Sequence, residues 1–203
     1  MIRNFLIYII IIISFKTHAQ NSSEINKVLQ LPDTLSYKKE IRIYKKYETT
    51  YSTEIFRMYD EGNNNWKVQI FYFSDQFKSV TKINEFEFPK EIIGKLKPKD
   101  ANLIWLQLLL CDIEHVPSFE KISYKLNKST IVLEDGEYGI QKQMKRVSDG
   151  NSYKVFLSNL KIKNNFRFEN PENYLKINPN VDELQSYTKL LFIIKKEFNL
   201  WNE

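Results

Sequence analysis

The sequence predicts an α+β fold: an antiparallel, aromatic-rich sheet of about seven strands, with one buried central helix and one amphipathic C-terminal helix packed on it. Segments of alternating apolar and polar residues occur on both sides of residue 100, which is the pattern of half-buried strands. The loops between them are too short for the crossovers of a parallel sheet. Helical patterns occur only near 100–114 and 181–200.

Residues 1–19 are expected to be a cleaved signal peptide. Arg3 gives a positive start, residues 5–15 form an uncharged, largely apolar run, and small residues at 17 and 19 suit a cleavage site before Gln20. An uncleaved membrane anchor is the alternative, but eleven residues rise about 16 Å against a hydrocarbon core of roughly 30 Å. We therefore expect export, to the periplasm or outside the cell, with no membrane span after cleavage.

Residues 20–36 are expected to form a polar arm, and residues 37–203 a single globular domain. Strand-like alternation begins at Ile41 and continues to Phe88, where Pro89 ends it. A Gly- and Asn-rich turn at 61–65 interrupts the alternation. The first half is therefore predicted to be a meander of about four antiparallel strands.

The central helix is predicted from Asp100, as N-cap, to about Glu114. Its residues are apolar almost all round, so we expect it to be buried. Pro117 marks its end.

The second half returns to strands. Expected strands are 130–134, 138–144 and 153–158, with a further one around 166–168. Two hairpin-type turns are expected between the first three, at Asp135-Gly136 and at 149–151.

The C-terminal helix has the clearest pattern in the chain. We expect Asn180 to be its N-cap, with Glu183 bonding back to it. Its apolar residues recur at spacings of three and four and make one stripe: Leu184, Tyr187, Leu191, Ile194, Phe198 and Trp201. We expect that stripe to pack on the sheet.

The charge pattern does not indicate nucleic-acid binding. The formal net charge is +5, and the lysines are scattered in short runs along the whole chain. Solvated faces explain such runs, whereas nucleic-acid arms carry longer basic blocks.

Cys111 and His115 are the first candidate pair for catalysis. Spaced four apart, they would share one helix face as a thiol and a base, or as part of a weak metal site. The alternative, which we favour, is a buried cysteine near a helix end that the histidine caps. His18 leaves with the signal, so no multi-histidine zinc site is possible, and we expect neither a metal nor a cofactor.

A second candidate is the acidic run Glu134-Asp135-Gly136-Glu137. Paired carboxylates catalyse hydrolysis when they face each other across a cleft, which makes a carboxylate-dependent hydrolase one alternative function. Neighbours on a turn usually point into water, so we prefer a charged hairpin tip.

Tyrosines supply the third candidate site. Tyr44, Tyr47, Tyr59 and Tyr72 cluster in the first predicted sheet, and exposed aromatic residues stack on sugars and on proteins. We therefore expect a non-catalytic exported protein that binds a protein or glycan of the cell envelope through these tyrosines. A carrier of a small apolar ligand is a further alternative, and the oligomeric state stays open. The signal ending at Ala19-Gln20 and the Ile-, Lys- and Asn-rich chain resemble exported bacterial proteins in general.

Overall fold

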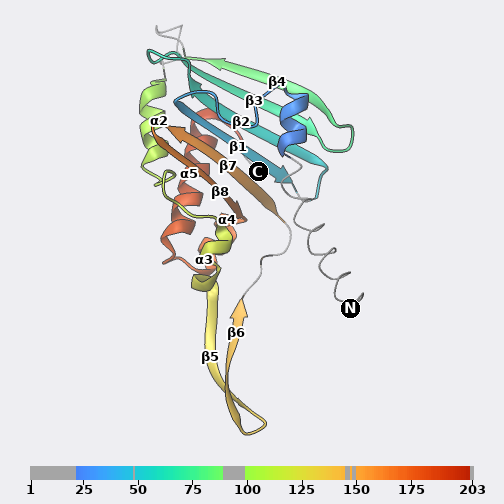
Figure 1. Ribbon diagram of the computed structural model, residues 1–203, viewed down its shortest axis with the longest axis vertical. Coiled ribbons are helices and arrows are strands. Elements are labelled where there is room, and N and C mark those ends of the chain that lie inside the picture. Colours follow the sequence, from blue (N-terminus) through green and yellow to red (C-terminus); the bar gives the residue numbers. More distant parts are fainter. Residues whose placement is uncertain (1–21, 48, 89–98, 145–146, 148–149, 202–203) are drawn as a thin grey trace, which may run out of the picture.

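The computed structural model describes residues 22–47, 49–88, 99–144, 147 and 150–201. Its main element is a six-stranded antiparallel sheet in the order β4-β3-β2-β1-β7-β8 (Figure 1). The strands are β1 (Lys39–Tyr47), β2 (Ser52–Asp60), β3 (Trp66–Ser74), β4 (Ser79–Glu87), β7 (Asn151–Asn159) and β8 (Ile162–Glu169). The predicted four-stranded meander is confirmed, and β1 joins it to the strands of the second half.

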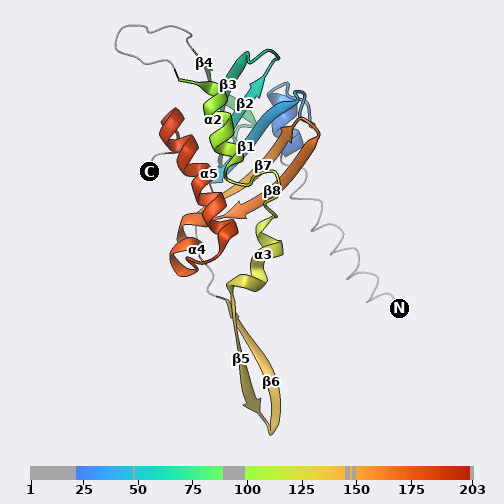
Figure 2. The ribbon, with the colours of Figure 1, turned by 90° about the vertical axis from the view of Figure 1, so that its left-hand side faces the viewer.

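Two further strands form a separate hairpin. Among the described strands, β5 (Asn127–Glu134) pairs only with β6 (Glu137–Met144), and the hairpin stands out from the body of the molecule (Figures 1 and 2). The turn at Asp135-Gly136 is confirmed: both residues have positive φ, 53° and 84°, as a tight hairpin turn requires.

The prediction of a hairpin turn at 149–151 is wrong. Residues 148–149 lie outside the described residues, but the strands on either side belong to different sheets. β7 pairs instead with β1 and β8, because its residues Val155 and Leu157 complete the apolar face that Ile41 and Ile43 begin.

Four helices pack on one face of the sheet, which confirms the α+β class. They are α2 (Ala101–Leu109), α3 (Phe119–Leu126), α4 (Pro171–Ile177) and α5 (Asp182–Phe198) (Figure 2). α3 and α4 were not predicted. The sequence signals that could have found them are the spacing of Phe119, Ile122 and Leu126, and a proline at the first helical position after Asn170.

The central helix is shorter and less buried than expected. Asp100 is its N-cap as predicted, its carboxylate accepting the backbone N–H of Leu103 at 3.0 Å. The helix ends at Leu109, and the chain turns with a positive φ at Asp112. Only one side of α2 faces the sheet, so Leu106 and Leu110 on the other side are about half and two-thirds exposed.

The stripe of the C-terminal helix is buried as predicted. Its N-cap is Val181, not Asn180, and no side chain caps the helix there. Glu183 instead accepts a hydrogen bond from Lys125 of α3 at 2.6 Å.

The opposite face of the sheet is covered by the chain before β1. Residues 22–28 form a short helix, and its Ile25 and Asn26 are 2% and 4% exposed. Part of the expected polar arm is therefore packed against the domain. The expected signal peptide and its cleavage site lie outside the described residues, within which no helix is long and apolar enough to cross a membrane.

Candidate functional site

The four candidate tyrosines do not share one face of the sheet. In the strand register, Tyr44 lies opposite Ile55 and on the same face of the sheet as Tyr59. The N-terminal segment, residues 22–38, covers this face. Tyr47 and Tyr72 lie on the helix-covered face. Because alternate residues of a strand point to opposite faces, these tyrosines are split two and two.

Tyr44 and Tyr59 are buried, at 5% and 7% exposed. The Tyr44 hydroxyl donates to the side-chain oxygen of Asn26, and the Tyr59 ring stacks on Tyr37 with their centroids 4.6 Å apart. Burial raises the pKa of both hydroxyls above the usual value for tyrosine. These two rings fill the outer core, and neither is an exposed aromatic platform.

Beneath the N-terminal segment lies a buried polar network centred on Glu40, which is fully buried. Its carboxylate accepts hydrogen bonds from Arg57 Nε at 2.8 Å and from Arg42 Nη2 at 3.1 Å. It also accepts the backbone N–H groups of Ser36 and Tyr37, at 2.8 and 3.1 Å. Burial alone raises the pKa of Glu40, but the hydrogen bonds from Arg57 and Tyr37 and the charges of Arg57 and Arg42 together outweigh it and lower that pKa. The network ties the chain before β1 to the sheet.

Tyr47 and Tyr72 are partly exposed and lie on either side of Glu54. The Tyr47 hydroxyl donates to Glu54 Oε1 at 2.9 Å, and Tyr72 is the register partner of Glu54 on β3. Burial, then the Glu54 charge, raises the pKa of Tyr72. Lys45 is fully buried beside them, its Nζ 4.3 Å from the centroid of the Tyr47 ring. A lysine ammonium lies over each ring: Lys45 over Tyr47 and Lys82 over Tyr72, the latter with its Nζ 5.6 Å from the ring centroid.

Cys111 and His115 lie in different environments. Cys111 is 1% exposed, and its thiol contacts the backbone carbonyl of Gln107 at 3.5 Å, whereas His115 is exposed. Burial raises the pKa of the Cys111 thiol to about 11, so the thiol is protonated at neutral pH. Since α2 ends before both residues, no continuous helix aligns them.

The acidic run forms the tip of the β5–β6 hairpin. Glu134, Asp135 and Glu137 are all exposed there. The hairpin projects away from the sheet (Figure 1), so no carboxylate of the described sheet strands faces its tip across a cleft. Within the described part of the chain, no cluster of His, Cys, Asp and Glu could hold a metal ion.

The most distinctive surface is one face of this hairpin, which we call the hairpin apolar face. Ile131 pairs with Ile140 and Leu133 with Tyr138 in the strand register. Residues two apart on a strand share a face, so these four side chains lie together. Their exposed fractions are 78%, 72%, 59% and 82%, respectively. Four large apolar side chains are therefore exposed to water, on strands that no other described element covers.

Sequence reasoning missed this surface although its signal was present. The alternation of Ile131, Leu133, Tyr138 and Ile140 with polar residues predicts strands with one apolar face. That pattern normally marks the face turned to the core. Only the strand pairing shows that the hairpin leaves the sheet.

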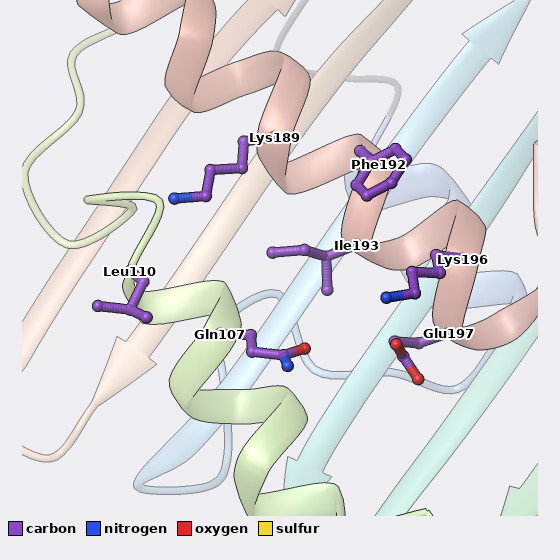
Figure 3. A pocket seen from close by; sticks show the side chains of 7 residues that line it. All are labelled: Gln107, Leu110, Lys189, Phe192, Ile193, Lys196 and Glu197. Carbon is purple, nitrogen blue, oxygen red and sulfur yellow. The ribbon is translucent and has the colours of Figure 1, made fainter.

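A second, smaller surface feature lies between α2 and α5. It is a groove of about 200 Å³, drawn in Figure 3, and is lined by Gln107, Leu110, Lys189, Phe192, Ile193, Lys196 and Glu197. Leu110 and Phe192 are 70% and 59% exposed. The groove thus opens on the outer side of the helices, and it is not an enclosed cavity between helices and sheet.

Comparison of the chain with protein-family models, with curated protein sequences and with solved structures finds no match. The fold and the surface define an α+β protein with an aromatic-rich antiparallel sheet and a projecting amphipathic hairpin.

Proposed function

We propose that this chain is an exported, non-catalytic binding protein that engages a protein partner through the hairpin apolar face. The observation that carries the proposal is the exposure of Ile131, Leu133, Tyr138 and Ile140 on one face of a hairpin that nothing else in the described part of the chain covers. Export is supported by the sequence of residues 1–19.

The size of the apolar face supports a binding role. A large side chain presents on the order of 150–200 Å² of surface, so the four residues together expose roughly 500 Å². A soluble monomer rarely leaves a contiguous apolar patch larger than a few hundred Å² without a function for it. An isolated two-stranded hairpin is also marginally stable in water, so a partner would stabilise it.

The chemistry of the face favours a protein over a glycan. Three of its four side chains are aliphatic, and Tyr138 is the only ring. Sugars are bound mainly by stacked rings together with side chains that hydrogen-bond to hydroxyls. Aliphatic and aromatic side chains surrounded by charged groups are typical of a protein interface.

A membrane surface fits the hairpin less well. Its tip carries the carboxylates of Glu134, Asp135 and Glu137, which anionic lipid headgroups repel.

Photo-crosslinking from defined positions tests the proposal. A photoreactive phenylalanine analogue replaces Leu133 on the apolar face in cells that produce the chain. The matched control carries the same analogue at Thr130, which is exposed on the opposite face of the same strand. We expect a discrete protein adduct from position 133 and little from 130, with adducts and mature N-terminus identified by mass spectrometry.

Two results would contradict the proposal. If position 133 yields no protein adduct, or yields only lipid adducts, the apolar face does not bind a protein. A chain that retains Met1 would refute export by cleavage.

A further inference from the structure

We infer that the partner of the hairpin apolar face is a second copy of this chain, with the two hairpins stacked antiparallel, tip to base. This inference rests on the proposed function above and names the partner of that surface. Three features of the hairpin carry it: its charge distribution, the register of its apolar residues and the area that they expose.

The hairpin is negatively charged at its tip and positively charged toward its base. Glu134, Asp135 and Glu137 are at the tip, whereas Lys128 and Lys142 lie on the base half, and all five are exposed. Two hairpins stacked tip to tip would bring three carboxylates against three. Antiparallel stacking instead places the tip turn with Asp135 at the level of Lys142 of the other copy, and Lys142 shares the apolar face, whereas Lys128, Glu134 and Glu137 lie on the opposite face of the hairpin.

The register of the apolar residues suits a twofold axis. The Ile131–Ile140 pair and the Leu133–Tyr138 pair form two levels along the hairpin, about 7 Å apart at 3.4 Å per residue. Consider a twofold axis that lies between the two stacked faces, perpendicular to the strands and midway between the two levels. This axis stacks Ile131 of one copy on Leu133 of the other. It also stacks Ile140 on Tyr138, so the face is complementary to itself, as a twofold interface requires.

Lys142 extends this match beyond the apolar residues. It lies two residues after Ile140 and therefore on the same face, one level nearer the base. The same axis carries it to the level of the other copy's tip turn. Each apolar core is thus bordered at both ends by a lysine and an acidic turn.

The area is sufficient for a reversible dimer. Complete burial of the apolar residues of both copies would remove at most roughly 1,000 Å² from water, and the contacts of Lys142 with the tip turn would add to this. Specific interfaces begin at about 1,000–1,200 Å² in total, so the dimer is expected to be weak and concentration-dependent.

The first test is sedimentation velocity over a range of protein concentrations. The sample is the protein in the form that cells accumulate. We expect a monomer–dimer equilibrium that Ile131→Lys weakens by more than about tenfold, because it places a charge in the centre of the interface. Thr130→Lys, on the opposite face of the same strand, is the matched control and should leave the equilibrium unchanged. Lys142→Glu should also weaken the dimer, because it places a carboxylate at the level of the acidic tip turn of the other copy.

Cysteine pairs then test the register. An equal mixture of the single variants Ile131→Cys and Leu133→Cys should form a disulfide-linked dimer in higher yield than either variant alone. A mixture of Ile131→Cys and Ile140→Cys reports instead on the tip-to-tip arrangement. Cys111 is buried and should not take part.

The outcomes separate this inference from the proposed function. A chain that stays monomeric at every concentration, or a dimer that Ile131→Lys leaves unchanged, overturns the inference. A higher yield from the 131–140 mixture overturns the antiparallel arrangement. If the chain is monomeric while position 133 crosslinks to a different protein, self-association fails and the proposed function stands. If position 133 crosslinks to nothing, both fail.

Discussion

Replacement of Glu40 by glutamine is expected to destabilise the protein by about 3 kcal/mol at neutral pH, because loss of one partner of a buried ion pair leaves the other charge uncompensated. Glu40 is fully buried and forms ion pairs with Arg57 at 2.8 Å and Arg42 at 3.1 Å. A neutral amide keeps the size of the side chain and one acceptor oxygen. It removes the charge that balances two guanidinium groups, and its NH2 group cannot accept their N–H bonds.

Urea unfolding followed by tryptophan fluorescence measures this loss, since Trp66, Trp105 and Trp201 are all buried in the body. The midpoint should fall while the slope stays constant, because the surface exposed on unfolding is unchanged. In a thermal scan, the same loss corresponds to a decrease of roughly 6–12 °C in Tm. The control is Glu85→Gln, an exposed carboxylate that accepts a hydrogen bond from Gln69, with an expected effect below about 0.5 kcal/mol.

The effect should depend on pH. The pKa of Glu40 is lowered in the folded protein, so its contribution to stability is complete above the ordinary pKa of a glutamate. That contribution is lost as the pH falls through the lowered value, in the acid range below about pH 4. The difference between wild type and Glu40→Gln should therefore shrink in acid. A loss below about 0.5 kcal/mol at pH 7 would refute the argument that this carboxylate holds the network together.

Three other substitutions or reagents give independent checks of the structure. Cys111 should resist thiol reagents in the native protein at pH 8, because burial raises the pKa of its thiol to about 11, and it should react after unfolding. Rapid labelling of the native protein would contradict the burial of Cys111. Gly150→Ala should cost about 1–3 kcal/mol in a denaturant melt, since its new Cβ would lie 1.6 Å from Asn170 Oδ1 and displace that side chain. Gly139→Ala, with no atom nearer than 4.0 Å, is its control, and equal effects would refute the clash. Asp100→Ala should cost about 1 kcal/mol through loss of the α2 N-cap, and an unchanged urea midpoint would contradict that role.

Much of the fold could be predicted because local patterns reflect local physics. Alternation through Ile41 and Ile43 marks a strand with one apolar face, and the stripe through Leu184 and Leu191 marks a helix packed on a core. Asp135-Gly136 tolerates the positive φ of a tight turn wherever the hairpin lies. Such signals depend on neighbours within a few residues, so they can be read without the tertiary structure.

The candidate site could not be predicted in the same way. The pattern around Tyr44 and Tyr59 indicates a strand residue, but their burial depends on a segment before β1 that packs across the sheet. Aromatic content alone does not distinguish a ring in a core from a ring on a surface.

By itself, the sequence determined the fold class, the first four strands, the helix starting at Asp100, the C-terminal stripe and the turn at the hairpin tip. The tertiary structure decided that β7 pairs with β1, and that the hairpin with Ile131 and Ile140 stays outside the sheet. The physical reason is that an apolar strand face has the same sequence pattern whether its partner is the core or another molecule. What covers the face is determined by long-range pairing, and none of the other described elements covers the hairpin apolar face.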